Sequence, residues 1–96
     1  MQADKKETIM KRQEIIDTVN AIMGEKGDYA AEYIEPDDAV DELGVSSMQC
    51  IEALVKIEDE FVIDIPGSEL LNVSTMQDVY DLVERKIIET HGFKVY

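Results

Sequence analysis

The sequence predicts an all-α fold, a four-helix bundle of three long helices and one short helix with a long loop between helices 1 and 2. Apolar residues recur at helical spacing over three stretches, and residues that favour helix ends bound those stretches. No stretch alternates apolar and polar residues over a length that would build a sheet. A chain of 96 residues has room for one domain, so we expect a single domain over 1–96, with its core over about 5–90 and a short tail over 91–96.

The first helix is predicted from about Lys5 to Met23. Its apolar stripe consists of Ile9, Ile16, Val19 and Met23, with Ile15 and Ile22 beside it. Gly24 and Gly27 lie on either side of Lys26. The glycines are a stop signal for the helix, and Lys26 places a cation near its end.

Residues 24–46 form the predicted loop. Tyr29–Ile34 can form a short helical turn, but Pro36 forces the residue before it towards extended backbone. Four apolar residues can pin the loop to the core: Ala39, Val40, Leu43 and Val45. A connection of roughly 20 residues without regular structure is uncommon in a small domain and is usually functional, so we expect a function for this loop.

The second helix is predicted from Ser46 to Phe61, ending near Val62. Ser46 followed by Gln49 is a capping box, with Ser46 at the N-cap and Gln49 at the third helical position. The expected core-facing residues are Cys50, Leu54, Ile57 and Phe61, and the expected solvent-facing residues are Glu52, Lys56, Asp59 and Glu60.

After an extended connection through Pro66, the segment 67–71 can form the short helix, capped by Gly67 or Ser68. Thr75 with Asp78 then resembles a capping box and opens the last long helix, which ends at Gly92. The apolar stripe of this helix is Met76, Val79, Leu82, Val83 and Ile87.

The chain is strongly acidic, with 22 Asp and Glu against 9 Lys and Arg and a net charge of −13. Residues 35–64 contain ten acids and only Lys56 as a base, a net charge of −9. This excess argues against a nucleic-acid partner. It fits either a solvated face or a docking surface for a basic partner. The chain has no apolar run long enough to span a membrane, and its start has no apolar signal region, so we expect a cytoplasmic monomer.

Sites for metals or catalysis are not predicted. A calcium loop starting at Asp37 would have Glu42 where an EF-hand needs glycine, and His91 is the only imidazole. Cys50 begins the core-facing set of the second helix, so we interpret it as a small buried apolar residue.

Ser47 is the candidate modification site. With Ser46 as the cap, Ser47 takes the first helical position, where the cap does not need its hydroxyl. A phosphate attached there would be stabilised by the helix dipole and by backbone N–H groups. From this motif alone, the simpler interpretation is that both serines only serve the helix start.

The stretch Leu43-Gly44-Val45-Ser46-Ser47-Met48 is followed by Ile57-Glu58-Asp59-Glu60-Phe61 and Ile63-Asp64-Ile65-Pro66. In this order and spacing, these segments resemble the sequence pattern of the acyl carrier protein family. The resemblance covers roughly residues 8–90 and implies a four-helix bundle with a long first loop. It implies that Ser47 receives 4′-phosphopantetheine from coenzyme A and that the chain carries acyl groups as thioesters, without a catalytic site of its own.

The resemblance also implies a docking surface on the second helix. Glu52, Glu58 and Asp59 fall on the acidic recognition helix, which docks basic patches of partner enzymes, and Met48 and Val55 fall where the family makes apolar contacts. The implied partners are a phosphopantetheinyl transferase, acyl-loading enzymes, and ketosynthases or other condensing enzymes.

Two residues depart from the family pattern. Ser46 stands where the family usually has an aspartate, and Gln49 replaces a frequently acidic residue. We therefore expect a specialised carrier in polyketide, fatty-acid-like or hybrid biosynthesis. A peptidyl or aminoacyl carrier is the alternative, and an unmodified acidic interaction module is a further one.

Overall fold

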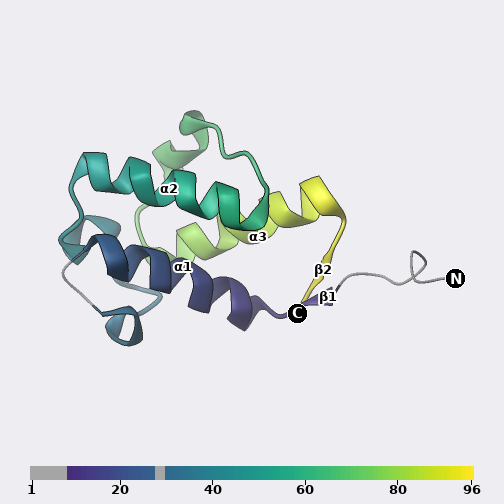
Figure 1. The fold of residues 1–96 in the computed structure, drawn as a ribbon, viewed down its shortest axis with the longest axis horizontal. Coiled ribbons are helices and arrows are strands. Elements are labelled where there is room, and N and C mark those ends of the chain that lie inside the picture. Colours follow the sequence, from purple (N-terminus) through teal and green to yellow (C-terminus); the bar gives the residue numbers. More distant parts are fainter. Residues whose placement is uncertain (1–8, 28–29) are drawn as a thin grey trace, which may run out of the picture.

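Three α-helices packed side by side form the body of the protein (Figure 1). The computed structural model describes residues 9–27 and 30–96. The helices are α1 (Arg12–Lys26), α2 (Ser47–Phe61) and α3 (Met76–His91). Three short 3-10 helices lie in the described connections: η2 (Ala31–Tyr33), η3 (Val40–Leu43) and η4 (Gly67–Asn72). With η4 as the short helix of the bundle, the predicted all-α class is confirmed.

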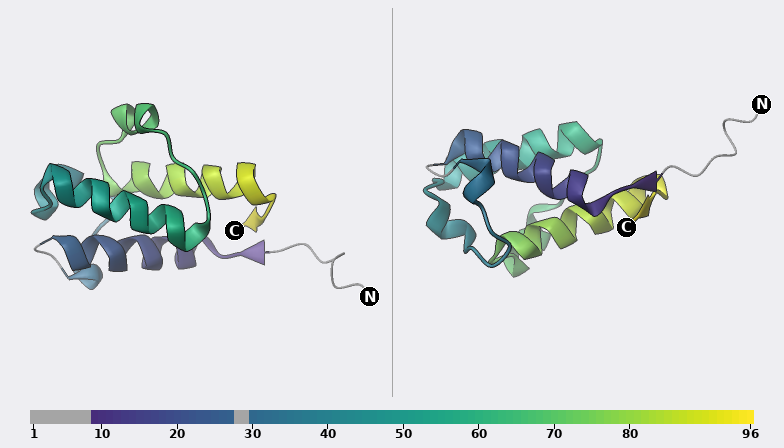
Figure 2. Two further views of the ribbon diagram at one scale, coloured as in Figure 1. Left: turned by 45° about the horizontal axis from the view of Figure 1, so that its top comes forward. Right: turned by 90° about the horizontal axis from the view of Figure 1, so that it is seen from below.

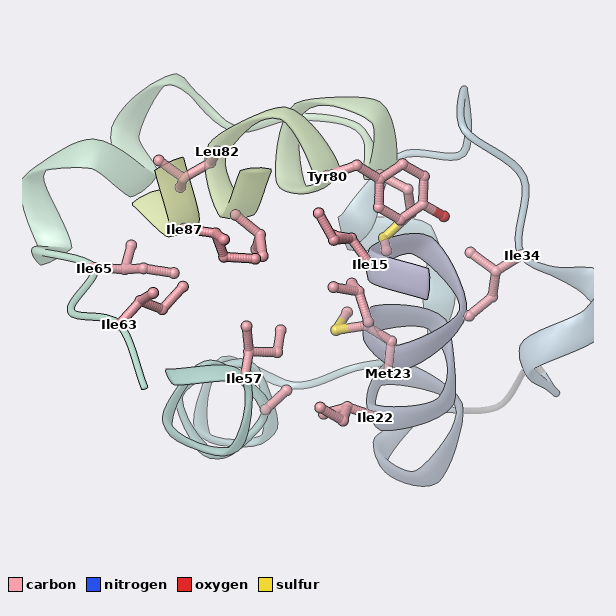
Figure 3. Packing of buried hydrophobic residues seen from close by; sticks show 14 of the residues in the cluster. Ile15, Ile22, Met23, Ile34, Ile57, Ile63, Ile65, Tyr80, Leu82 and Ile87 are labelled. Atoms are coloured by element: carbon pink, nitrogen blue, oxygen red, sulfur yellow. The ribbon is translucent and has the colours of Figure 1, made fainter. Parts of the chain in front are cut away.

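The core fills the space between the three helices (Figure 3). Its most deeply buried side chains come from all of them and from the loop: Ile15, Val19, Leu43, Met76, Tyr80, Val83 and Ile87. Of the residues predicted to anchor the long loop, Leu43 is 1% exposed, so the prediction is confirmed for this residue. Ile34, which was not among them, is also buried, with 7% exposed. The other expected pins, Ala39, Val40 and Val45, are half-buried.

The start of the first helix differs from the prediction. Residues 5–8 lie outside the described part of the chain, and Ile9–Met10 form a short strand, β1, rather than helix. β1 pairs in parallel with β2 (Lys94–Val95), inside the segment expected to be a tail (Figure 2). The expectation of no strand was therefore wrong, because a pairing of two residues with two others leaves no periodic pattern in the sequence.

The predicted end of the first helix is also too early. The helix continues through Gly24 to Lys26, and Gly27 is its C-cap. η4 likewise follows Pro66, which occupies the cap position instead of Gly67 or Ser68.

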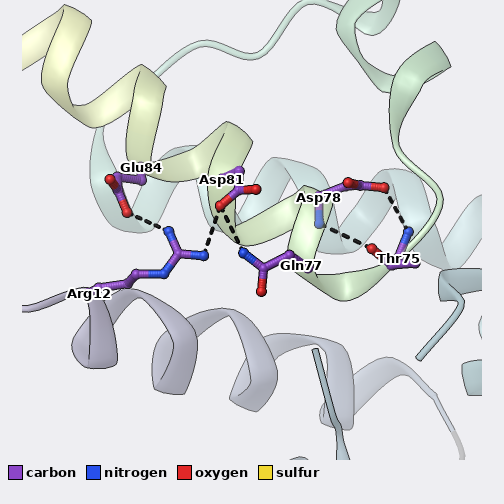
Figure 4. A network of polar contacts seen from close by, with 6 residues as sticks. All are labelled: Arg12, Thr75, Gln77, Asp78, Asp81 and Glu84. Atoms are coloured by element: carbon purple, nitrogen blue, oxygen red, sulfur yellow. Dashed lines mark hydrogen bonds and ion pairs between the residues drawn. The ribbon is translucent and has the colours of Figure 1, made fainter. Parts of the chain in front are cut away.

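Both predicted helix starts are confirmed in atomic detail. Ser46 Oγ accepts a hydrogen bond from Gln49 N at 3.1 Å, while Gln49 Oε1 accepts one from Ser46 N at 2.9 Å. Thr75 and Asp78 form the same reciprocal pair at the start of α3 (Figure 4). Each pair satisfies backbone N–H groups that a helix start leaves without a helical partner.

Two polar ties fix α1 against α3. Arg12 contacts Glu84 at 2.5 Å and Asp81 at 2.8 Å (Figure 4). In the interior, Tyr80 Oη donates a hydrogen bond to Asn20 Oδ1 at 2.5 Å. These ties hold the framework against which α2 packs.

Candidate functional site

Ser47 is the exposed first residue of α2, at the end of the bundle remote from β1 and β2 (Figure 1). The capping box uses the hydroxyl of Ser46, so the cap does not require the Ser47 hydroxyl. The structure therefore separates the two serines into a cap and an exposed hydroxyl, as predicted.

The loop before Ser47 is held against the end of α1. Leu43 anchors it in the core, and Gly44 reverses the chain with a φ of 74°. A Cβ on Gly27 would lie 2.5 Å from the carbonyl oxygen of Leu43 and 2.8 Å from Cγ2 of Val45. Only glycine permits this approach. The sequence analysis gave Gly27 only the role of a helix stop, because its contact with the loop is visible only in the tertiary structure.

The surroundings of Ser47 suit a phosphate. The N-terminus of a helix carries partial positive charge, and backbone N–H groups of the first turn point outward there. No acidic residue occupies the first turn of α2. An exposed hydroxyl with these neighbours fits an O-linked phosphodiester.

An apolar cavity of about 200 Å³ opens one turn further along α2. It lies between α2, the loop and α3, and its lining residues are Met23, Val40, Asp41, Cys50, Ala53, Leu54, Ile57, Leu70, Val73 and Val79. Cys50 is half-buried and faces this cavity, whereas the sequence analysis placed it in the core. Burial and the nearby Asp41 carboxylate raise the pKa of its thiol, which therefore stays protonated at neutral pH.

Four of the expected docking residues lie along one face of α2. Met48 and Val55 are 67% and 49% exposed, and Glu52 and Asp59 are exposed as well. Their spacing of four, three and four residues places them on the same side of the helix. Glu52 also forms an ion pair with Lys26 of α1, with a distance of 3.4 Å between Oε1 and Nζ.

Glu58, the fifth expected docking residue, forms a hydrogen bond within the fold. It is half-buried, and its Oε2 accepts a hydrogen bond from Ile65 N at 2.7 Å. The carboxylate therefore stabilises the turn that follows α2.

His91 contacts the end of α2, a contact that the sequence analysis missed. Its Nε2 lies 2.9 Å from the carbonyl oxygen of Phe61 and 3.0 Å from that of Val62, so Nε2–H donates to them.

Among residues 9–27 and 30–96, no helix combines the length and apolarity needed to cross a membrane. Within the same residues, no three His, Cys, Asp or Glu side chains are grouped so that they could bind a metal ion.

A family model described as the phosphopantetheine attachment site matches residues 13–83 of the chain. The chain belongs to the acyl carrier protein family. The acyl carrier protein of Thermosynechococcus vestitus is 29% identical over 79 residues, which cover 81% of this chain and 98% of the relative. That of Buchnera aphidicola is 32% identical over 73 residues, covering 75% and 91%.

Solved structures agree with this assignment. The crystal structure of the acyl carrier protein from Thermotoga maritima matches this carrier with a TM-score of 0.70 and 28% identity, over 81% of this chain and 92% of that one. Hexanoyl acyl carrier protein from the actinorhodin polyketide synthase of Streptomyces coelicolor shares the fold, with a TM-score of 0.66 at 18% identity.

Family membership establishes the general chemistry. The cofactor is 4′-phosphopantetheine, and the chain is a carrier without catalytic activity of its own. Its partners therefore include a phosphopantetheinyl transferase and pathway enzymes.

Proposed function

We propose that this carrier is modified on Ser47 and transports acyl intermediates in polyketide, fatty-acid-like or hybrid biosynthesis. The exposed Ser47 hydroxyl at the start of α2 carries the proposal, because Ser46 alone supplies the cap. In the modification, Ser47 Oγ forms a phosphodiester with the pantetheine phosphate of coenzyme A, and adenosine 3′,5′-bisphosphate leaves. When attached, the arm supplies a terminal thiol that holds the cargo as a thioester.

The apolar cavity beside Cys50 supports an acyl cargo. Its volume of about 200 Å³ exceeds the roughly 150 Å³ of a cavity that admits benzene. An apolar lining favours hydrocarbon and penalises an unpaired ammonium group. An acyl tail of modest length therefore fits this cavity best.

An aminoacyl cargo is the second candidate, and Asp41 is the observation that favours it. This acidic residue lines the otherwise mostly apolar cavity, where its carboxylate could pair with a cargo ammonium group. Mass spectrometry of the arm isolated from the native host distinguishes an acyl from an aminoacyl cargo.

The α2 face of Met48, Glu52, Val55 and Asp59 is the proposed docking surface, and the half-buried Glu58 lies beside it. Its exposed apolar and acidic groups suit basic patches on the transferase, on acyl-loading enzymes and on ketosynthases or other condensing enzymes. We place this monomeric carrier in the cytoplasm, where such enzymes would reach it.

Incubation with coenzyme A and a broad-specificity phosphopantetheinyl transferase tests the attachment site. We expect the intact protein to gain the mass of one phosphopantetheine. Ser47→Ala should abolish the gain, whereas Ser46→Ala, the matched control, should retain it because the cap does not accept the phosphate.

Two outcomes would contradict this proposal. No gain with several transferases would favour the unmodified acidic interaction module instead. Loss of the gain in Ser46→Ala alone would reverse the assignment of cap and acceptor.

A further inference from the structure

η4, the short helix between α2 and α3, has little packing to hold it in place. None of its residues is buried. Its backbone hydrogen bonds are local: Glu69 N donates to the carbonyl oxygen of Pro66 at 3.0 Å, and Val73 N donates to that of Leu70 at 3.1 Å. Figure 2 shows η4 projecting from the bundle on the connection between the two long helices. Packing alone therefore does not fix its position.

η4 nevertheless forms one wall of the apolar cavity. Leu70 and Val73 line the cavity from this side, while Met23 of α1 and Leu54 of α2 line it from the others. The next residue of η4, Leu71, faces away and is 84% exposed. A displacement of η4 would therefore change the space that the cavity offers to an acyl tail.

A second hollow lies between η4 and α3. It has a volume of about 370 Å³, and its lining includes Ser68 and Asn72 of η4 and Asp81 and Leu82 of α3. Polar side chains make up much of this lining, so the hollow suits water rather than an acyl tail. η4 therefore has no tightly packed support against this part of α3.

Glu69 connects η4 to α3 by charge. Its Oε1 accepts a hydrogen bond from Arg85 Nη2 at 2.5 Å, and its Oε2 is paired with Lys86 Nζ. Hydrogen bonds from Lys86 and Arg85 lower the pKa of the Glu69 carboxyl, which is therefore ionised at neutral pH. The Glu69 and Lys86 side chains are only 22% and 14% exposed, so salt screens this pair less than a fully exposed one. We call these two ion pairs the η4 latch.

We propose that the η4 latch holds Leu70 and Val73 over the apolar cavity and so limits the acyl tail that this carrier shelters to about eight carbons. A cavity of roughly 150 Å³ admits the six carbons of benzene, and the limit scales that value to about 200 Å³. A longer tail would have to displace η4 and break both ion pairs. Glu69 is thus a positioning residue for the cargo. This inference rests on the proposed carrier function.

Glu69→Gln tests the inference, because it removes the charge and keeps the shape of the side chain. A broad-specificity phosphopantetheinyl transferase loads the carrier from hexanoyl-, octanoyl-, decanoyl- or dodecanoyl-coenzyme A, and the melting temperature of each product is measured. For the unaltered carrier, the melting temperature should rise up to octanoyl and then level off, because carbons outside the cavity bury no further area. For Glu69→Gln, it should keep rising up to dodecanoyl, by about 3 °C for each additional buried methylene.

Glu89→Gln is the matched control. Glu89 contacts the same two cations, with Oε2 3.7 Å from Arg85 Nη1 and Oε1 3.4 Å from Lys86 Nζ, but it lies on α3 itself and does not hold η4. Its series should level off at octanoyl. Without cargo, both variants should melt within about 4 °C of the unaltered protein. A general loss of stability would lower a whole series and leave the tail length at which it levels off unchanged.

Three results would overturn the inference: a Glu69→Gln series that levels off at octanoyl, a Glu89→Gln series that extends as far as that of Glu69→Gln, or an unaltered carrier whose melting temperature keeps rising up to dodecanoyl. Intact mass, measured before melting, separates these results from a failure of the proposed function. If no acyl-phosphopantetheine is attached to the unaltered chain, the proposed function fails and the inference fails with it. If the arm is attached, only the η4 latch is in question.

Discussion

Adjacent carboxylates on α2 have different tasks at the scale of single residues. Glu58 bonds to Ile65 N and so stabilises the turn after the helix. Asp59 is exposed and lies in line with Met48 and Val55 on the proposed docking face. Because one carboxylate serves the fold and the other faces solvent, charge reversal should separate their effects.

Asp59→Lys should slow acyl transfer to a condensing enzyme several-fold, because it repels a basic partner. The loss should be largest at low salt, where charges are least screened, and the free energy of unfolding should change by less than about 0.5 kcal/mol. Stopped-flow transfer kinetics and urea titration measure the two effects.

Glu58→Lys is the matched variant for this experiment. It should lower the free energy of unfolding by about 1–3 kcal/mol, because the backbone N–H of Ile65 loses its partner. Equal transfer rates for Asp59→Lys and the unaltered carrier at low salt would count against electrostatic docking.

At the scale of elements, the start of α2 decides how Ser47, the proposed attachment site, is presented. The Ser46–Gln49 capping box satisfies the helix start without the aspartate that is usual in the family. The neutral cap explains how the helix start stays ordered, although fewer acidic residues lie beside Ser47 than is usual in the family.

Ser46→Ala should lower the free energy of unfolding by about 1 kcal/mol, the usual effect of losing an N-cap side chain. For a domain of this size, the melting temperature should fall by roughly 4–8 °C. Thermal unfolding followed by circular dichroism measures the change.

Ser46→Asp is the control, because aspartate caps a helix as well as serine and suits the positive end of the dipole. Its melting temperature should equal or exceed that of the unaltered protein. If Ser46→Ala melted at the same temperature as Ser46→Asp, the capping box would have no energetic role.

At the scale of the whole molecule, the net charge of −13 acts on stability as well as on partners. Self-repulsion of like charges destabilises a compact chain. Exposed ion pairs such as Lys56–Glu25 oppose this effect, but pairs of this kind contribute little each. Repulsion should therefore dominate the response to salt.

Raising NaCl from 10 to 150 mM should increase the melting temperature, because the screening length falls from about 30 Å to about 8 Å. Differential scanning calorimetry measures the shift, and sucrose at matched osmolality controls for effects unrelated to charge. A lower melting temperature at 150 mM would mean that the ion pairs outweigh the repulsion.

The sequence by itself determined the three long helices and the two capping boxes, because these depend on residues within one or two turns of each other. Periodicity and capping act locally, so they can be read from the chain.

Only the tertiary structure decided three features. These are the pairing of β1 with β2, the close approach of Gly27 to the loop before Ser47, and the hydrogen bond from Ile65 N to the Glu58 carboxylate. It also showed His91 holding the strained turn at Val62, from an element almost thirty residues further along. These features depend on contacts between segments that are distant in sequence or on the geometry of a turn, and neither leaves a periodic pattern in the chain. The same holds for Met48, Ile51 and Val55, apolar residues of α2 that are exposed because the core faces the opposite side of the helix.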